Sequence, residues 1–278
     1  MTQQRGAEGT DWRAKEAENR KEDVTRDHGI EGTCTAMCSI EEVRERKRTK
    51  DISRFEYPRA EPRGEPAWAV KKYRRPAAGR IEMNARELRP LHVLATTLQH
   101  LFDTVLPWPG CGFDWEAGVD LRNSDVDTLP SPTVQHDFLA MYHFVSDRVR
   151  SVRQDLVIQR IQGAGRAAAL MQTARFHVLS SVCALRLLDP NDKTLDWSET
   201  LNDQQLASAL TEVHAQWQED DSSDHSVRML HEEALVYDML LHLHDPHAVR
   251  HLVVSFKPPV YVWLSVSSSP SRQVTITT

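Results

Sequence analysis

Four histidines near the end of the chain are the residues most suggestive of metal chemistry. They are His242, His244, His247 and His251, and the last two stand four residues apart, so one face of a helix would carry both. Zinc hydrolases use this spacing with a glutamate directly after the first histidine as the general base. Here that position holds Ala248. We therefore favour solvated histidines at a helix end, and a metal-dependent hydrolase is the weakest of three functional hypotheses.

The cysteines could also bind a metal. Cys34 and Cys38 lie close to His28, but their spacing has no second pair, and the other two cysteines, Cys111 and Cys183, are far away in the sequence. Structural zinc sites use four ligands. Four cysteines in 278 residues also do not make a disulfide framework. We interpret them as packing cysteines in a reducing compartment and expect no metal and no cofactor.

Two further patterns typical of enzymes do not fit. The glycines of Gly163-Ala164-Gly165 follow a predicted helix, whereas a phosphate-binding loop follows a strand. A Ser–His–Asp triad cannot be assigned from the sequence. We expect no catalytic residues and no small-molecule substrate.

A basic cluster is the candidate for nucleic-acid binding. Its cations could neutralise phosphates, and an aromatic ring set among them could stack on one base. The alternative is that Tyr73 and Val70 fix an extended segment onto the helices while the cations pair with acids, and the sequence leaves both open. The cluster consists of Lys71, Lys72, Tyr73, Arg74, Arg75 and Arg80.

A second charged set favours a structural role. Its members are three to five residues apart on a predicted helix, so opposite charges could pair, or could tie down the extended segment that precedes the helix. The set is Asp147, Arg148, Arg150, Arg153 and Asp155.

The composition is that of a polar chain with enough apolar residues for a core. Hydrophobic residues make up 40% and charged residues 27%, and the net charge is −6. Residues 41–89 contain 15 Lys/Arg against 9 Asp/Glu, whereas residues 189–245 contain 14 Asp/Glu against only Lys193 and Arg228. We find no apolar stretch of the ~20 residues that a membrane span needs. The charge separation could provide one face for phosphate or acidic partners and another for basic ones, but on charge alone we favour the alternative that both runs are solvated faces.

The first 90 residues contain few regular elements. Residues 1–30 are charged, and we expect them to be disordered. Residues 31–90 contain several prolines, so we expect an extended segment draped over the rest of the protein. A short helix is expected from Ser39, with Glu42 three residues later as in a capping box.

Residues 87–254 show helical periodicity throughout. Apolar residues recur at three- and four-residue steps, which predicts at least five helices in sequential antiparallel hairpins and no sheet. Asn202 is the expected N-cap of the fourth helix, and a sixth is expected from Pro246. The fold class is all-α. The predicted stripes are Leu91, Leu94, Leu98, Leu101, Phe102 and Val105; Phe138, Met141, Val145, Val149, Val152 and Leu156; Leu170, Ala174, His177, Ser181, Leu185 and Leu188; Leu206, Leu210, Val213 and Trp217; and Leu230, Ala234, Tyr237 and Leu241.

Several short blocks occur in one order along the chain. They begin with Gly32-Thr33-Cys34 and Met37-Cys38, continue through 70–79 (VKKYRRPAAG) and Leu88-Arg89-Pro90, and end with 144–155 (FVSDRVRSVRQD) and 174–177 (ARFH). This set resembles the SAC-three/GANP family over roughly residues 31–254. The resemblance implies a helical stack of the kind found in TPR and PCI proteins. The family's domain continues to a PCI winged helix, whereas this chain leaves the pattern at Val254, so we interpret 255–278 as an aberrant or disordered tail.

What the resemblance implies about function is scaffolding in messenger-RNA export. It implies a nuclear protein at the pore or in the nucleoplasm, with a PCI-type partner, weak RNA or DNA binding, and no membrane association. The alternative, from the short family members, is an interaction protein of the centrosome and spindle, with cytoplasmic and centrosomal localisation.

Overall fold

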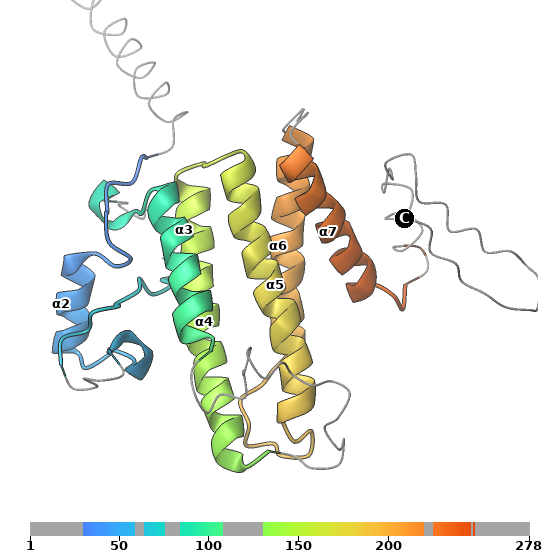
Figure 1. Ribbon diagram of the computed structural model, residues 1–278, viewed down its shortest axis with the longest axis horizontal. Coiled ribbons are helices and arrows are strands. Elements are labelled where there is room, and N and C mark those ends of the chain that lie inside the picture. The colour runs from blue at the N-terminus through green and yellow to red at the C-terminus, as the bar shows by residue number, and fades with distance from the viewer. Residues whose placement is uncertain are drawn as a thin grey trace, which may run out of the picture.

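The computed structural model describes residues 30–58, 64–75, 84–107, 130–219, 225–245 and 247. The described regular elements are all helical: α2 (Ile40–Arg48), the 3-10 turns η1 (Arg54–Glu56) and η2 (Ala85–Glu87), α3 (Leu91–His100), the π-helical turn η3 (Leu101–Val105), α4 (Pro132–Ile158), α5 (Ala164–Leu187), α6 (Glu199–Glu219) and α7 (His225–Leu241). Successive helices from α3 to α7 run antiparallel and lie side by side in chain order (Figure 1). The predicted all-α stack is confirmed for this part of the chain.

Local sequence accounts for where these helices begin and end. Pro132 stands in the first turn of α4. Backbone N–H groups there make no hydrogen bond within the helix, so the missing N–H of proline costs nothing. Gly163 has φ of 85°, a conformation that favours glycine, and it separates α4 from α5. The oxygen Oγ of Ser198 accepts a hydrogen bond from the Leu201 nitrogen, so Ser198 caps α6.

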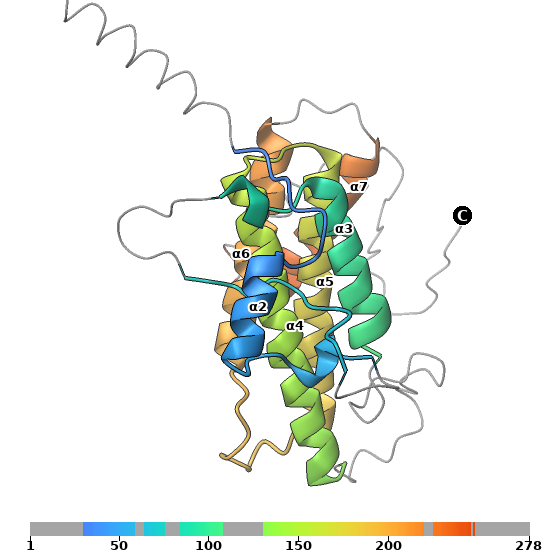
Figure 2. The same ribbon diagram turned by 90° about the vertical axis from the view of Figure 1, so that its left-hand side faces the viewer.

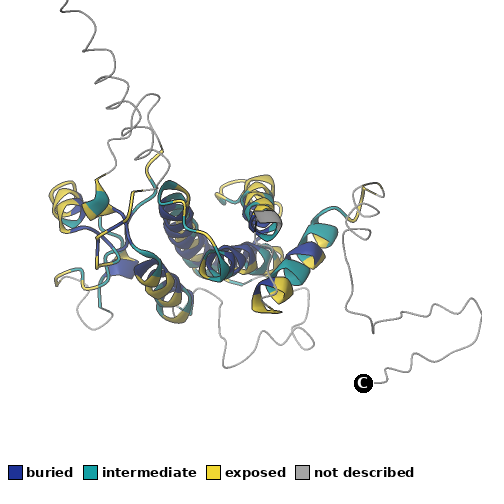
Figure 3. Cartoon of the chain, turned by 90° about the horizontal axis from the view of Figure 1, so that it is seen from above, coloured by how far each residue is buried: buried dark blue, intermediate teal, exposed yellow. Residues whose placement is uncertain are grey.

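The core lies between α3, α4, α5 and α6. All six predicted stripe residues of α4, Phe138 through Leu156, are fully buried. Seen from above, the residues coloured as buried concentrate on the central helices (Figure 3). One predicted core residue is wrong. Leu185 is 86% exposed because it lies on the outer side of α5, whereas Ala184 and Leu188 on the other side are buried.

The segment before α3 lies across the helical stack, as predicted. Figure 2 shows α2 and the adjoining chain in front of α4. The segment contributes two buried side chains, Phe55 and Val70, to the common core, and the Phe55 ring lies 5.3 Å from that of Phe144 on α4. Residues 31–90 therefore share the core of the helices and do not build a separate one in the ranges described.

Two expectations about helix caps need correction. Ser39 caps α2 as predicted, but Glu42 does not complete a capping box, because its carboxylate accepts the Lys72 backbone N–H at 2.8 Å. Asn202 is not a cap: it lies inside α6 and is fully buried. Its side chain joins α6 to α4 and α5 by bonding Tyr142, His177 and Ser181 at 2.8–3.1 Å.

Several predictions fall outside the described residues. These are nearly all of the disordered start at 1–30, most of the sixth helix from Pro246, and the tail at 255–278. Within the described part, no helix is both long and apolar enough to cross a membrane.

Candidate functional site

Four polar residues on one face of α4 hold the N-terminal segment. Asp147, Ser151, Asp155 and Gln159 follow one another at four-residue steps, which places them in a row along the helix. We call this row the polar ladder. It faces three stretches of the preceding chain, around residues 32, 71–73 and 88–89.

Asp155 is the charged centre of the polar ladder. Its carboxylate is fully buried and accepts hydrogen bonds from Lys71 Nζ at 2.7 Å and Arg89 Nε at 2.8 Å. Arg89, itself fully buried, also donates to Ser151 Oγ at 2.9 Å and to the Met37 carbonyl at 3.2 Å. Each buried charge thus has an opposite charge and further hydrogen bonds, which is the condition under which burial is tolerated.

The outer rungs of the ladder bond to backbone. Asp147 Oδ2 accepts the Tyr73 N–H at 3.2 Å. Gln159 Oε1 accepts the Gly32 N–H at 2.8 Å, and its amide nitrogen donates to the Arg89 carbonyl at 2.8 Å. A Cβ on Gly32 would lie 2.4 Å from the Leu88 carbonyl oxygen, so only glycine fits there.

A second buried cluster joins α2, η1 and α4. Glu56 is fully buried and accepts hydrogen bonds from Arg46 and from the Val70 N–H, the latter at 2.9 Å, and Arg148 lies 3.7 Å away. Burial acts to lower the pKa of Arg46, but the hydrogen bond that Arg46 donates to Glu56 and nearby negative charge outweigh it and raise that pKa. Arg46 therefore stays charged within this cluster.

The Gly-Thr-Cys and Met-Cys blocks act through backbone and packing. The Thr33 and Cys34 nitrogens donate to the Ala85 and Leu88 carbonyls at 2.8 and 2.9 Å. Cys34 and Cys38 are buried, and burial raises the pKa of Cys38 to about 12, so its thiol holds its proton. No group of three metal-binding side chains occurs among the described residues. His28 and His251 lie outside them.

The predicted nucleic-acid cluster is divided by the fold. Lys71 is only 8% exposed and pairs with Asp155, so it cannot be a surface phosphate contact, which corrects our expectation for that residue. Lys72 pairs with Asp51 at 2.7 Å, and Arg74 pairs with Glu45 at 2.9 Å. The structural alternative left open by the sequence accounts for these three cations.

The other members of that cluster lie elsewhere. Arg75 is exposed, and Arg80 lies outside the described residues. The guanidinium of Arg150 lies over the Tyr73 ring in a cation–π contact, with its carbon Cζ 4.2 Å from the ring centroid. The charged set on α4 therefore separates into three groups: Asp147 and Asp155 in the ladder, Arg148 beside Glu56, and Arg150 and Arg153 in a groove.

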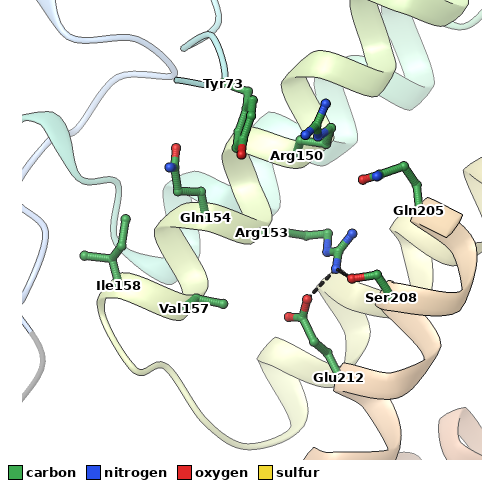
Figure 4. Close-up of a pocket in the computed structure, with 9 residues that line it drawn as sticks. All are labelled: Tyr73, Arg150, Arg153, Gln154, Val157, Ile158, Gln205, Ser208 and Glu212. Atoms are coloured by element: carbon green, nitrogen blue, oxygen red, sulfur yellow. Dashed lines mark hydrogen bonds and ion pairs between the residues drawn. The ribbon is translucent and has the colours of Figure 1, made fainter. Parts of the chain in front are cut away.

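Arg150 and Arg153 line a groove of about 410 Å³ between Tyr73, α4 and α6. Figure 4 shows Tyr73 and Arg150 on one side and Ser208 and Glu212 on the other, with Arg153 reaching between them. Arg153 pairs with Glu212 and donates to Ser208 Oγ at 2.6 Å. We call this the α4–α6 groove; its lining is completed by Gln154, Val157, Ile158 and Gln205.

Sequence reasoning missed three parts of this arrangement. Ser151 was not singled out, although its four-residue spacing from Asp147 and Asp155 could have identified it. The groove joins residues more than fifty positions apart, so no local pattern indicates Ser208 or Glu212. Asp155, the buried acid of the ladder, is paired in the interior with Lys71 and Arg89.

The chain is similar to known proteins over most of its length. A model of the SAC3/GANP family matches residues 37–262. SAC3 family protein 1 of Schizosaccharomyces pombe is 28% identical over 220 residues, which are 79% of this chain and 18% of that protein. SAC3 family protein B of Arabidopsis thaliana is 28% identical over 54% of this chain and 7% of its own length. Protein xmas of Drosophila melanogaster is 25% identical over 65% of this chain and 8% of its own length. The chain thus spans less than a fifth of each of these relatives.

Proposed function

Because the chain belongs to the SAC3/GANP family, we propose that it acts as a non-catalytic scaffold within a nuclear mRNA-export assembly. The family relationship supports an export-related scaffold in general, and the specific partner, the RNA contact and the nuclear localisation are parts of the proposal. The polar ladder is the structural observation that best supports the scaffold proposal. Lys71, Arg89 and Asp155, from three of the family-like blocks, bind one another in the interior and fix one segment onto another, which builds a rigid surface.

We infer that a protein partner docks on the outer face of α7. Met229, Val236 and Leu240 recur at helical spacing and are 41–57% exposed, and Leu243 follows with 65%. A contiguous exposed apolar stripe is typical of protein–protein contact. A PCI-type export subunit that offers an amphipathic helix has the complementary surface.

Affinity capture tests this contact with a matched pair of variants. Leu240→Glu places a charge in the stripe, whereas Leu185→Glu makes the same change at an exposed leucine on α5. We expect the wild type and L185E to co-purify a PCI-type export subunit and L240E to lose it. Cells that depend on L240E should accumulate polyadenylated RNA in the nucleus.

The same experiment distinguishes the centrosomal alternative. If the wild-type chain captures no export subunit, leaves polyadenylated RNA evenly distributed, and localises to spindle poles, the export proposal is wrong. Weak nucleic-acid binding is a separate part of the proposal. It would involve the members of the basic cluster other than the buried Lys71, namely Lys72, Arg74, Arg75 and Arg80, together with Tyr73.

A further inference from the structure

The α4–α6 groove has more hydrogen-bond donors than its own residues satisfy. Among the described residues that line it, Glu212 is the only acid, and this carboxylate is already shared between Arg153 and Arg166. Arg150 has the Tyr73 ring as its described contact. The groove therefore has a local surplus of positive charge.

Arg153 supplies a second, independent observation. Its side chain is 90% buried, and its Nε is buried without a hydrogen-bond partner. A buried guanidinium without its full set of hydrogen bonds costs free energy, so a negative charge placed beside Arg153 would be favoured. The side chain lies across the groove (Figure 4) and is 10% exposed, which places this cation in the wall of the groove. The ligand at this wall should carry negative charge.

The other walls suit a flat group. The guanidinium of Arg150 lies over the Tyr73 ring, which makes a planar pair at the mouth of the groove. Val157 is 53% exposed although it is apolar, and with Ile158 it forms a hydrophobic wall. Gln154 and Gln205 add side-chain amides, which can both donate and accept. Single-stranded RNA is read by this combination of ring or guanidinium planes, amides and phosphate-binding cations.

We propose that the α4–α6 groove binds one nucleotide of single-stranded RNA, with its phosphate on Arg150 and Arg153 and its base against the planar pair and the apolar wall. This inference rests on the proposed function and relocates its RNA contact. Lys71, Lys72 and Arg74 are paired with acids, whereas Tyr73 lines the groove. An acidic peptide would satisfy the arginines but would make no use of the planar surface and the amides.

Binding of a ten-residue oligouridine to the full chain, measured by fluorescence anisotropy, tests the proposal. Arg150→Gln removes one cation from the groove, and Arg228→Gln removes one from the surface of α7, where it is 45% exposed. We expect R150Q to weaken binding about tenfold and R228Q less than twofold. The slope of the logarithm of the binding constant against the logarithm of the salt concentration should be about 0.7 less steep for R150Q than for the wild type. This difference is expected when one phosphate contact is lost.

A blocking variant separates a local effect from misfolding. Ser208 is exposed on α6, so Ser208→Phe should fold as wild type, with an unchanged circular dichroism spectrum, while filling the groove and weakening binding about tenfold. Oligouridine that contains 4-thiouridine should cross-link to peptides with Tyr73 or residues 150–158.

Two outcomes would overturn the proposal. The first is wild-type RNA affinity in folded R150Q and S208F, or cross-links confined to other segments. The second is binding of a polyglutamate peptide that R150Q and S208F abolish while RNA binding is unaffected, which would assign the groove to an acidic protein segment. In either case the proposed docking of the export subunit on α7 would be unaffected, because it uses a different surface and is tested by a separate experiment.

Discussion

Replacing Asp155 with Asn removes the charge at the centre of the polar ladder while keeping the side-chain volume. In the native chain this fully buried carboxylate accepts hydrogen bonds from Lys71 at 2.7 Å and from Arg89 at 2.8 Å. The amide can still accept one of these bonds, but neither cation retains a full opposite charge. The N-terminal segment should therefore be held less tightly on α4.

The expected magnitude follows from the burial of the two cations. Removing one member of a buried ion pair costs about 3–5 kcal/mol, because the remaining charge is uncompensated. Arg89 is fully buried, whereas the Lys71 ammonium keeps its bond to the Glu87 carbonyl at 2.9 Å. We expect a loss of about 4 kcal/mol in the free energy of unfolding, out of a total of ~5–15 kcal/mol for a domain. The melting temperature should fall by about 10 °C.

Urea unfolding followed by circular dichroism measures the loss, and limited proteolysis locates it. Asp51→Asn is the matched control, because its pair with Lys72 is exposed and should contribute less than about 1 kcal/mol. D155N should be cleaved first within residues 31–90. Adding Lys71→Met to D155N should restore part of the stability by removing one uncompensated cation. If D155N unfolds within 1 kcal/mol of wild type, with the wild-type cleavage pattern, the polar ladder does not hold the segment.

Three further predictions address other contacts. Gly32→Ala should destabilise the chain by about 1–3 kcal/mol and expose residues 31–38 to protease, because its Cβ would clash with the Leu88 carbonyl. Asn202→Ala should lower the melting temperature and loosen the contacts of α6 with α4 and α5, since Tyr142 and His177 lose a buried partner. Burial lowers the pKa of His177 to about 4, below the value of about 6.5 in an unfolded chain, so the unfolded state binds more protons between these values. The free energy of unfolding should then fall by about 1.4 kcal/mol per pH unit as the pH drops from about 6.5 to 4, and a urea midpoint that stays constant from pH 7 to pH 5 would contradict this assignment.

The helices could be predicted from sequence because their signals are local. The stripe of α4 from Phe138 to Leu156 is complete in the structure, and the glycine break before α5 lies where it was expected. Asn202 was misassigned for the same reason. As a residue type it is a good cap, and only the packing of α6 on α5 shows that its amide meets His177 in the interior.

The site could be predicted only in part, because partner choice is not local. Lys71 and Lys72 are adjacent and chemically alike, yet the first is buried on Asp155 and the second is paired with Asp51 near the surface. Their alternation across an extended segment decides which of them faces α4. Neither the identity of the residues nor their charge indicates that division.

The polar ladder explains what three of the family-like blocks have in common. Gly32 binds Gln159, Tyr73 binds Asp147, and Lys71 and Arg89 share Asp155, so all three blocks meet the same face of α4. Together they fix how the N-terminal segment lies over α4, and substitution within them should impair folding before it impairs binding. Partner recognition must then depend on side chains that the ladder does not use. In the described part of the chain, the outer face of α7 and the walls of the α4–α6 groove are two such surfaces, and each can be altered without touching the ladder.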